Sequence, residues 1–152
     1  EESDEQAIRQ PAPVKQGVTP SAQVLHTAFK QMNSLQYLQS KTGGVHAAGW
    51  VIPDGGIQLV LEDVGRHNAL DKLIGAVARQ GMDFQSGFAI ITSRASYEMV
   101  QKAATVGISL LAAISAPTGL AIRLAEKTGL TLIGFTRNHN HAVYANPRRI
   151  TK

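Results

Sequence analysis

The chain has 152 residues, of which 43% are hydrophobic and 17% are charged. This length and this balance are typical of a single globular domain that is large enough to bury a core. The lack of cysteine excludes disulfides, thiolate metal sites and thiol catalysis within these residues. No apolar run approaches the roughly 20 residues that span a membrane, and the polar, acidic start does not resemble a signal peptide. These features leave the compartment undecided; we expect the cytoplasm by default, and no membrane partner.

The net charge of +4 conceals an asymmetry, because four of the first five residues are acidic. The rest of the chain holds 15 basic and 7 acidic side chains. Such an excess favours an anionic partner, namely a nucleotide, a cofactor phosphate or a nucleic acid, although a solvated basic surface explains the charge equally well. The few aromatic residues (one Trp, three Tyr and four Phe) are not interleaved with basic residues, as a base-stacking surface requires. We therefore expect no nucleic-acid partner.

The chain begins with an arm and a helix. Residues 1–18 are polar, contain two prolines and show no sustained period, which predicts a flexible arm or linker before a single domain at 19–152. Thr19 offers an N-cap with Pro20 at the first helical position, so a helix is expected over 20–39. Four apolar residues recur there at helical spacing, namely Leu25, Phe29, Met32 and Leu35. Of these, Phe29 and Met32 are assigned to the core.

Strands and helices alternate through the remainder of the chain. Strands at 47–52 and 57–62 flank Pro53-Asp54-Gly55-Gly56, which has the composition of a hairpin turn. Each later helix is followed by a glycine that can cap it: Gly81, Gly107 and Gly129. The further expected elements are helix 68–80, strand 87–92, helix 96–106, strand 108–114, helix 118–128 and strand 130–136. This order predicts an α/β fold with a mixed, partly parallel sheet flanked by helices.

The loops that follow the strands contain arginines and hydroxyls. Parallel strands end at one edge of a sheet, so Arg66, Arg94 and Arg137 are expected to face a common crevice. A hydroxyl in such a loop caps the next helix, and the free N–H groups of that helix favour an anion. Ordinary capping is the simpler interpretation of each hydroxyl, but the three arginines favour a phosphate-bearing ligand. The candidate hydroxyls are Ser93 or Ser96 after one strand, and Ser115 or Thr118 after the next.

The densest group of ionisable residues comprises Glu62, Asp63, Arg66 and His67. A metal or acid–base cluster is one interpretation, but His46 is the only obvious further imidazole upstream and no zinc-ligand spacing appears. The favoured alternative is that a carboxylate pairs with Arg66 or orients an imidazole, and so organises the wall of the crevice. His67 also remains a candidate catalytic base. We expect no metal site.

Residues 42–48 (TGGVHAA) invite comparison with base deaminases, whose signature is H-x-E followed by P-C-x-x-C. Ala48 stands in place of the general acid/base glutamate and the cysteine ligands are lacking, so hydrolytic deamination is disfavoured. Gly43 and Gly44 are better explained by a close approach of the backbone to a ligand or a neighbouring segment. His46 is equally well interpreted as a ligand contact or as a buried, hydrogen-bonded histidine.

Several long strings of the sequence are distinctive. The most specific are EDVGRHNALDK (62–72) and, within ITSRASYEMVQKAATVGI (91–108), SRASYEMVQKA. The other strings are TGGVHAAGW (42–50), SAPTGLAIRLAEKTGLTLIGF (115–135) and VYANPRRI (143–150). Together they resemble the FdhD family of formate dehydrogenase accessory proteins, and the resemblance covers about residues 20–150 in unbroken order.

The resemblance implies a function and a set of partners. Members of the family are sulfur carriers: they accept sulfur as a persulfide from a cysteine desulfurase and pass it to the molybdenum cofactor, bis-molybdopterin guanine dinucleotide, for formate dehydrogenase. The family also implies a cytoplasmic location, a homodimer and a core similar to that of cytidine deaminases. Its Cys-x-x-Cys loop lies just before the matched region, so this cysteine-free chain is expected to be a C-terminal fragment or, less favoured, a paralogue without the carrier cysteine.

The family's cofactor-binding segment corresponds by position to Phe135, Thr136, Arg137, Asn138, His139 and Asn140. Family members usually have glycine and arginine near the end of that segment, where this chain has His139 and Asn140, so part of the phosphate contact is expected to fall on Arg94 or Arg66. The expected cofactor site therefore adds Ser93, Arg94, Ser115 and Thr118, with His46, Glu62, Arg66 and His67 as crevice support and GDP as a mimic of the cofactor. No catalytic residue is assigned and the chain's status as an enzyme is left open. The alternatives are a metal-dependent hydrolase of deaminase-like fold and a nucleotide-binding module without catalysis.

Overall fold

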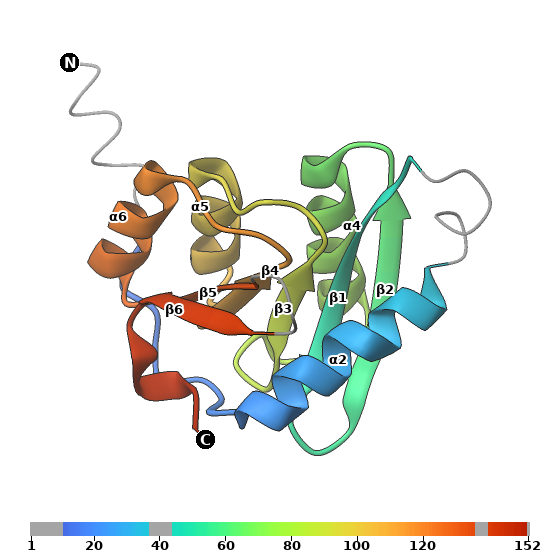
Figure 1. Cartoon of the computed structure of the whole chain (residues 1–152), viewed down its shortest axis with the longest axis horizontal. Helices are drawn as coiled ribbons and strands as arrows, with labels where there is room; N and C mark the ends of the chain where they lie inside the picture. The colour runs from blue at the N-terminus through green and yellow to red at the C-terminus, as the bar shows by residue number, and fades with distance from the viewer. Residues whose placement is uncertain (1–10, 37–43, 136–139, 152) are drawn as a thin grey trace.

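A six-stranded sheet with helices on both faces forms the core of the structure (Figure 1). The structure is a computed structural model, and it describes residues 11–36, 44–135 and 140–151. The α/β fold with a mixed sheet is confirmed. In chain order the elements are α2 (Ala22–Leu35), β1 (His46–Ile52), β2 (Gly56–Asp63), α4 (Arg66–Arg79), β3 (Phe88–Ile91), α5 (Tyr97–Thr105), β4 (Leu110–Ala113), α6 (Gly119–Thr128), β5 (Thr131–Phe135), β6 (His141–Ala145) and the 3₁₀ helix η2 (Pro147–Arg149).

The strands are arranged in the order β2-β1-β3-β4-β5-β6. The predicted hairpin is confirmed, because β1 is antiparallel to β2 and Ile52 lies opposite Gly56. β1 is also antiparallel to β3, whereas β3, β4 and β5 are parallel to one another. β6 adds to β5 in the antiparallel sense. The sequence does not predict β6, which is short and mostly half-buried and therefore lacks a strong apolar pattern.

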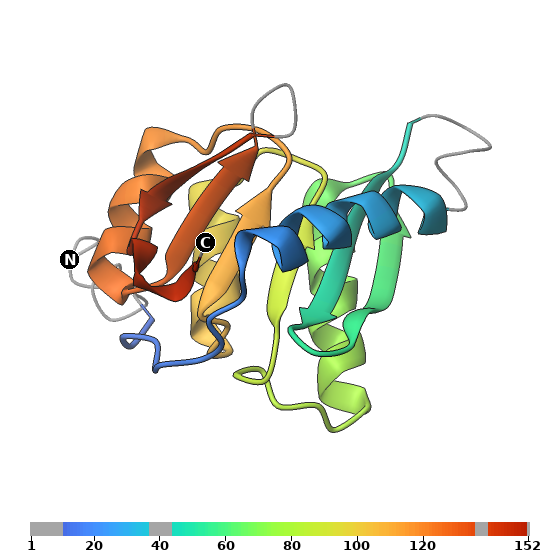
Figure 2. The ribbon, with the colours of Figure 1, turned by 60° about the horizontal axis from the view of Figure 1, so that its bottom comes forward.

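Both faces of the sheet are covered, which gives the molecule three layers. α4, α5 and α6 pack on one face, and α2 crosses the other (Figure 2). Alternate residues of β1 follow this division: Ala48 and Trp50 face the three helices, while Ala47 and Val51 face α2. A strand buried on both faces has no polar alternation, which explains why β3 is entirely apolar. No helix in the described part of the chain is long and apolar enough to cross a membrane.

The first helix begins two residues later than the sequence predicts. Ser21, and not Thr19, is the N-cap: its Oγ accepts a hydrogen bond from the backbone N–H of Val24 at 3.2 Å. Pro20 stays outside the helix because its carbonyl accepts a hydrogen bond from the N–H of Thr151 at 3.0 Å. This pairing with the C-terminal segment is a tertiary contact, so it cannot be predicted from the local capping pattern.

The predicted core positions Phe29 and Met32 are confirmed, and Leu25 of the same apolar stripe is buried as well. Leu35, the last residue of the stripe, is 53% exposed. Leu35 is the last residue of α2, and Gln36 is its C-cap. The predicted continuation over 37–39 lies outside the described residues.

The three later helices match the predictions within two residues at each end. Ser96 and Thr118 are the N-caps of α5 and α6, and each side chain accepts a hydrogen bond from an N–H of the first turn. Gly129 caps the end of α6 in the left-handed conformation, with φ of 80°. This conformation favours glycine, which is the physical reason why a glycine predicts this helix end.

The segment before α2 is held against the body of the protein by Arg149, which is 1% exposed. Its guanidinium donates hydrogen bonds to the carbonyl oxygens of Lys15 (2.9 Å), Gln16 (2.6 Å) and Gly129, and to Oγ1 of Thr131 (3.2 Å). These partners lie where β5 begins, at the edge of the sheet opposite to the ends of the parallel strands.

Candidate functional site

Four strands end at the same edge of the sheet and bring the polar loops together. β2, β3, β4 and β5 all run towards this edge, because β1 is antiparallel to both β2 and β3. β1 and β6 begin there, at His46 and His141. We call this the polar edge; its described segments are 44–46, 63–67, 92–96, 114–118, 135 and 140–141.

The strand order separates two arginines that the sequence predicts to share a crevice. β1 lies between β2 and β3, so the loop with Arg66 and the loop with Arg94 are two strand spacings apart, about 10 Å. The space between them is occupied by the start of β1, where His46 lies opposite Asp63. Both arginines are at the polar edge and both are exposed. Arg137 lies outside the described residues.

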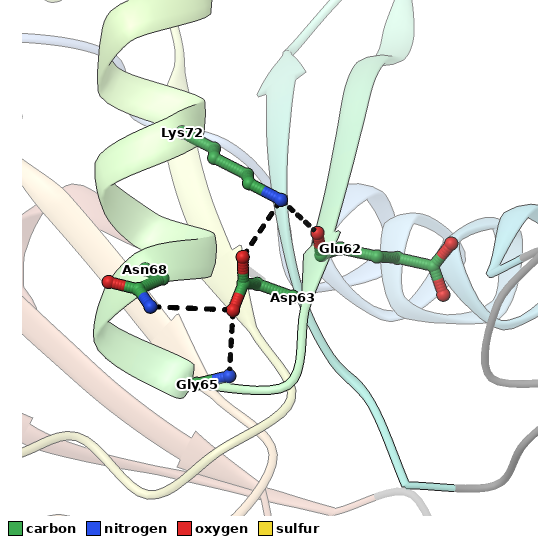
Figure 3. A network of polar contacts seen from close by, with 5 residues as sticks. All are labelled: Glu62, Asp63, Gly65, Asn68 and Lys72. Atoms are coloured by element: carbon green, nitrogen blue, oxygen red, sulfur yellow. Dashed lines mark hydrogen bonds and ion pairs between the residues drawn. The ribbon is translucent and has the colours of Figure 1, made fainter.

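Asp63 organises the turn from β2 into α4 (Figure 3). Its Oδ1 accepts hydrogen bonds from the N–H of Gly65 at 2.9 Å and from Nδ2 of Asn68 at 3.4 Å. Its Oδ2 lies 2.8 Å from Nζ of Lys72, which also donates to the carbonyl of Glu62 at 3.0 Å. The carboxylate of Glu62 points away from this network (Figure 3). Asp63, at the end of β2, is therefore paired with Lys72 of α4. Its role is structural.

The Lys72 ammonium, followed by the Gly65 N–H, lowers the pKa of the Asp63 carboxyl to about 2 from its ordinary 3.8. Because the folded state holds this carboxylate ionised, its contribution to stability is complete above about pH 4 and is lost as the pH falls to about 2. We expect the free energy of unfolding of the parent to fall more steeply than that of Asp63→Asn over this window. Denaturant unfolding at several pH values between 2 and 5 measures the difference.

Asp54→Asn is the matched control for this prediction. It removes the same charge from the exposed turn of the β1–β2 hairpin, so it reports any effect of net charge alone. Parallel pH dependence in the parent and in Asp63→Asn would contradict the assigned role of the Lys72 pair.

The network fixes the start of α4, where Arg66 and His67 lie in the first turn. Arg66 is exposed and His67 is half-buried. Neither side chain hydrogen-bonds another residue in the part of the chain that the structure describes. A cation in the first turn of a helix is disfavoured by the helix dipole, so the charge of Arg66 does not stabilise α4.

The hydroxyls of the next two loops divide into caps and non-caps. Oγ of Ser96 accepts from the N–H of Met99 at 3.4 Å, and Oγ1 of Thr118 accepts from the N–H of Ala121 at 3.1 Å. Ser93 is buried, 3.8 Å from Sδ of Met99, whereas Ser115 is half-buried. The simpler capping interpretation therefore holds for Ser96 and Thr118, and Ser93 faces the core.

Arg94 connects the loops after β3 and β4. Its Nε donates to the carbonyl of Ala116 at 2.8 Å, and the N–H of Thr118 donates to the carbonyl of Ala95 at 3.0 Å. The two terminal amino groups of Arg94 have no hydrogen-bond partner among the described residues. The arginine is thus held by one nitrogen with the other two available, beside the N-termini of α5 and α6.

Phe135 packs against α2, with its ring centroid 4.4 Å from that of Phe29 and 5.0 Å from that of His26. His141 joins this cluster through a hydrogen bond of 2.9 Å between its Nδ1 and Nε2 of His26. Asn140 is exposed. The other predicted residues of this segment, Thr136, Arg137, Asn138 and His139, lie outside the described residues.

A cavity of about 370 Å³ opens at the polar edge on the side of the sheet that α2 covers. Sequence reasoning finds His46 and Gly44 in its lining but misses three polar residues: Asn33, Gln36 and Thr92. Asn33 and Gln36 are three positions apart at the end of a helix, which places them on one face. That spacing is the signal that could have identified them. Among the described residues no group of three or more His, Asp or Glu could hold a metal ion.

The fold and this edge define a class of protein: a mixed-sheet α/β domain whose polar loops and three helix N-termini gather where the parallel strands end. The family follows from comparison with known proteins. The model of the FdhD/NarQ family matches residues 1–151, and the chain belongs to that family.

Two relatives and one solved structure illustrate the match. The "Sulfur carrier protein FdhD" of Cupriavidus necator is 54% identical over 149 residues, which cover 98% of this chain and 52% of the relative. The protein of the same name from Xanthomonas oryzae pv. oryzae is 54% identical over 149 residues and 53% of its own length. The crystal structure of a "putative formate dehydrogenase accessory protein" from Desulfotalea psychrophila superposes with a TM-score of 0.85 at 28% identity, over 95% of this chain and 61% of that one. The chain thus spans about half the length of the curated relatives it matches.

Proposed function

We propose that this chain is the cofactor-binding core of a sulfur carrier that serves formate dehydrogenase. In this role sulfur passes from a cysteine desulfurase to the molybdenum cofactor, bis-molybdopterin guanine dinucleotide. The observation that carries the proposal is membership of the FdhD/NarQ family together with 54% identity to proteins named as sulfur carriers, over 98% of this chain.

The polar edge has the chemistry that phosphate groups of such a cofactor require. The free terminal nitrogens of Arg94 lie beside the N-termini of α5 and α6, where backbone N–H groups and the helix dipole favour anions. Arg66 offers a second cation about 10 Å across the sheet, a span that suits a dinucleotide better than a single phosphate. The proposed site also includes Ser93, Ser115, Thr118 and the segment from Phe135 to Asn140, with His46, Glu62 and His67 as supporting residues.

The composition of the chain limits the part of the sulfur transfer that it can perform. The chain has no cysteine, so the thiol that carries sulfur must lie outside these 152 residues. The part of the reaction assigned to this chain is to bind and orient the cofactor, whose molybdenum takes the sulfur when bound. Holding it in a fixed position is a sufficient contribution, since orientation alone accelerates a transfer between two bound groups.

Several further features belong to the same proposal. They are a core similar to that of cytidine deaminases, a homodimer, contact with the formate dehydrogenase apoenzyme and a cytoplasmic location.

Titration with GDP, which represents part of the cofactor, tests the proposed site. We expect Arg94→Ala to weaken GDP binding about tenfold or more, because a charge-assisted hydrogen bond to phosphate is lost. Arg137→Ala is expected to act in the same direction. Isothermal titration calorimetry measures both dissociation constants.

Arg79→Ala serves as the control, because it removes an exposed arginine from the last turn of α4, at the other end of that helix. Equal weakening in Arg79→Ala would show that binding depends on net charge alone. GDP affinity that is unchanged in Arg94→Ala and Arg137→Ala would reject the phosphate site.

A further inference from the structure

Exposed cations gather around the end of α6, at the edge of the sheet opposite to the polar edge. Lys127 is in the last turn of α6, and Gly129 caps that helix. Arg148 of η2 lies against this cap, with one terminal nitrogen 3.5 Å from the position that a Cβ atom of Gly129 would take. Lys15 belongs to the segment that the buried Arg149 holds here. Lys15, Lys127 and Arg148 are all exposed, and we call them the basic patch.

The basic patch has no carboxylate partner in the part of the chain that the structure describes. Glu126 of α6 is exposed nearby but forms no ion pair with its members. Arg149 adds a fourth positive charge beneath the patch, and its described partners are three carbonyls and a hydroxyl. Burial, followed by the charge of Arg148, lowers the pKa of Arg149 from its ordinary value. Like charges therefore already repel one another in the free protein.

The stability of the fold explains only part of this arrangement. A cation in the last turn of a helix is favoured by the helix dipole, which accounts for Lys127. Lys15 and Arg148 lie outside that helix, and a group of like charges without counter-charges destabilises a compact state. Such a group is the pattern expected of a surface that binds an anionic partner.

The arrangement of the charges indicates the kind of partner. A small anion needs donors that converge on one point, whereas these cations are exposed on three separate segments and the N–H groups of Arg149 are used by protein acceptors. Nucleic-acid binding relies on longer rows of cations, on the order of 6–10 phosphate contacts, or on aromatic side chains for stacking. None of α6, η2 and segment 11–18 contains an aromatic residue. An acidic protein surface fits these features best.

The backbone that carries the basic patch is fixed before any partner binds. The N–H of Val14 donates to the carbonyl of Thr128 at 2.8 Å, and the carbonyl of Lys15 accepts from Arg149 at 2.9 Å. These bonds hold the segment before α2 beside the end of α6 (Figures 1 and 2). Cations on a rigid backbone lose less conformational freedom on binding than cations on a mobile one.

We propose that the basic patch is a docking surface for a protein partner whose own surface is acidic. Exposed Pro13 and Pro147 border the patch and add apolar area, which protein interfaces combine with arginine. Because the patch and the polar edge lie at opposite edges of the sheet, the partner can dock while a ligand occupies the polar edge. The docking surface goes beyond the proposed function and does not depend on it.

Fluorescence anisotropy with labelled poly-L-glutamate as the acidic probe tests the docking surface. Lys127→Glu/Arg148→Glu reverses two charges of the patch, and we expect it to bind the probe about tenfold or more weakly than the parent at low salt. The neutral variant Lys127→Gln/Arg148→Gln should lie between the two. Lys30→Glu/Arg79→Glu is the matched control, since it makes the same change in net charge at exposed positions of α2 and α4. It should weaken binding by no more than about threefold.

Thermal unfolding checks that each variant is folded, and the two charge-reversal variants should bind GDP equally because neither changes the polar edge. A failure of the docking surface is thus distinct from a failure of the proposed function. The inference is overturned if the parent does not bind poly-L-glutamate, or if the patch variant and the control lose equal affinity, since net charge alone would then explain the binding.

Two further measurements exclude other occupants of the basic patch. A labelled DNA duplex should bind the parent more weakly than poly-L-glutamate does; equal or tighter binding that is lost in Lys127→Glu/Arg148→Glu would replace the protein partner with a nucleic acid. Neutralisation of the acids at the start of the chain should leave poly-L-glutamate binding unchanged. Tighter binding would show that these acids themselves occupy the patch, namely Glu1, Glu2, Asp4 and Glu5.

Discussion

Arg149→Met is expected to lower the free energy of unfolding by about 3–5 kcal/mol. The guanidinium satisfies three backbone carbonyls and one hydroxyl, and it does so with no carboxylate among its described partners. Burial, followed by the neighbouring Arg148, lowers the pKa of Arg149 from its ordinary value. The charge is tolerated because its N–H groups are largely satisfied, and its removal leaves the carbonyls of Lys15, Gln16 and Gly129 without this donor.

Thermal and denaturant unfolding measure this effect, which corresponds to a decrease in Tm on the order of 10 °C for a domain of this size. Arg148→Met is the control, since Arg148 is the exposed neighbour and contacts Asn146 at 3.3 Å. It should change stability by no more than about 0.5 kcal/mol. Equal loss in both variants would show that charge, and not the buried network, is responsible.

Gly17→Ala is expected to destabilise the protein by about 2–4 kcal/mol, from backbone strain and overpacking together. Gly17 has φ of 66°, and a Cβ atom there would lie 1.8 Å from Oγ and 2.6 Å from Cβ of Ser109. Ser109 is fully buried immediately before β4, so it cannot move away freely.

The double variant Gly17→Ala/Ser109→Gly separates the two causes by denaturant unfolding. Removal of the Ser109 side chain should relieve the steric clash and recover part of the loss, while about 1–2 kcal/mol of backbone strain remains. Ser109→Ala alone should be neutral or slightly stabilising, because Oγ of Ser109 is buried without a hydrogen bond to any residue that the structure describes. The packing interpretation is wrong if the destabilisation of the double variant equals the sum of the destabilisations of Gly17→Ala and Ser109→Gly.

Both predictions concern the edge of the sheet opposite to the polar edge. Arg149 and Gly17 hold the segment before α2 near the starts of β4 and β5, whereas Arg94 lies in the loop after β3, where the parallel strands end. Below its melting temperature, Arg149→Met should therefore bind GDP as the parent does. Stability and ligand binding can thus be tested by separate sets of variants.

Local signals in the sequence predicted most of the elements. The hairpin turn and the glycines after α4, α5 and α6 depend on backbone conformation within a few residues. The sequence pattern for such features therefore does not depend on how the rest of the chain packs. The start of α2 was missed because it depends on the contact between Pro20 and Thr151. β6 was missed because a short, half-buried strand is defined by its pairing with β5 and not by its own composition.

The positions of the polar loops were predicted in outline and corrected in detail. The sequence placed Arg66 and Arg94 in loops after strands, and the structure confirms that both lie at one edge. It could not place β1 between those strands, because strand order depends on which surfaces pack together. The sequence also left open whether Glu62 or Asp63 pairs with Arg66 or orients an imidazole, whereas in the structure Nζ of Lys72 lies 2.8 Å from Asp63.

The sequence by itself determined the α/β class, the residues available for chemistry and, through its long specific strings, the family. These properties are encoded in residue identity and in spacings of a few positions. The tertiary structure decided which of those residues meet: a neutral cavity at the end of α2, a cationic surface beside α5 and α6, and a buried arginine at the opposite edge. Such contacts join residues that are distant in the chain, and their geometry is set by the packing of α2 and the sheet.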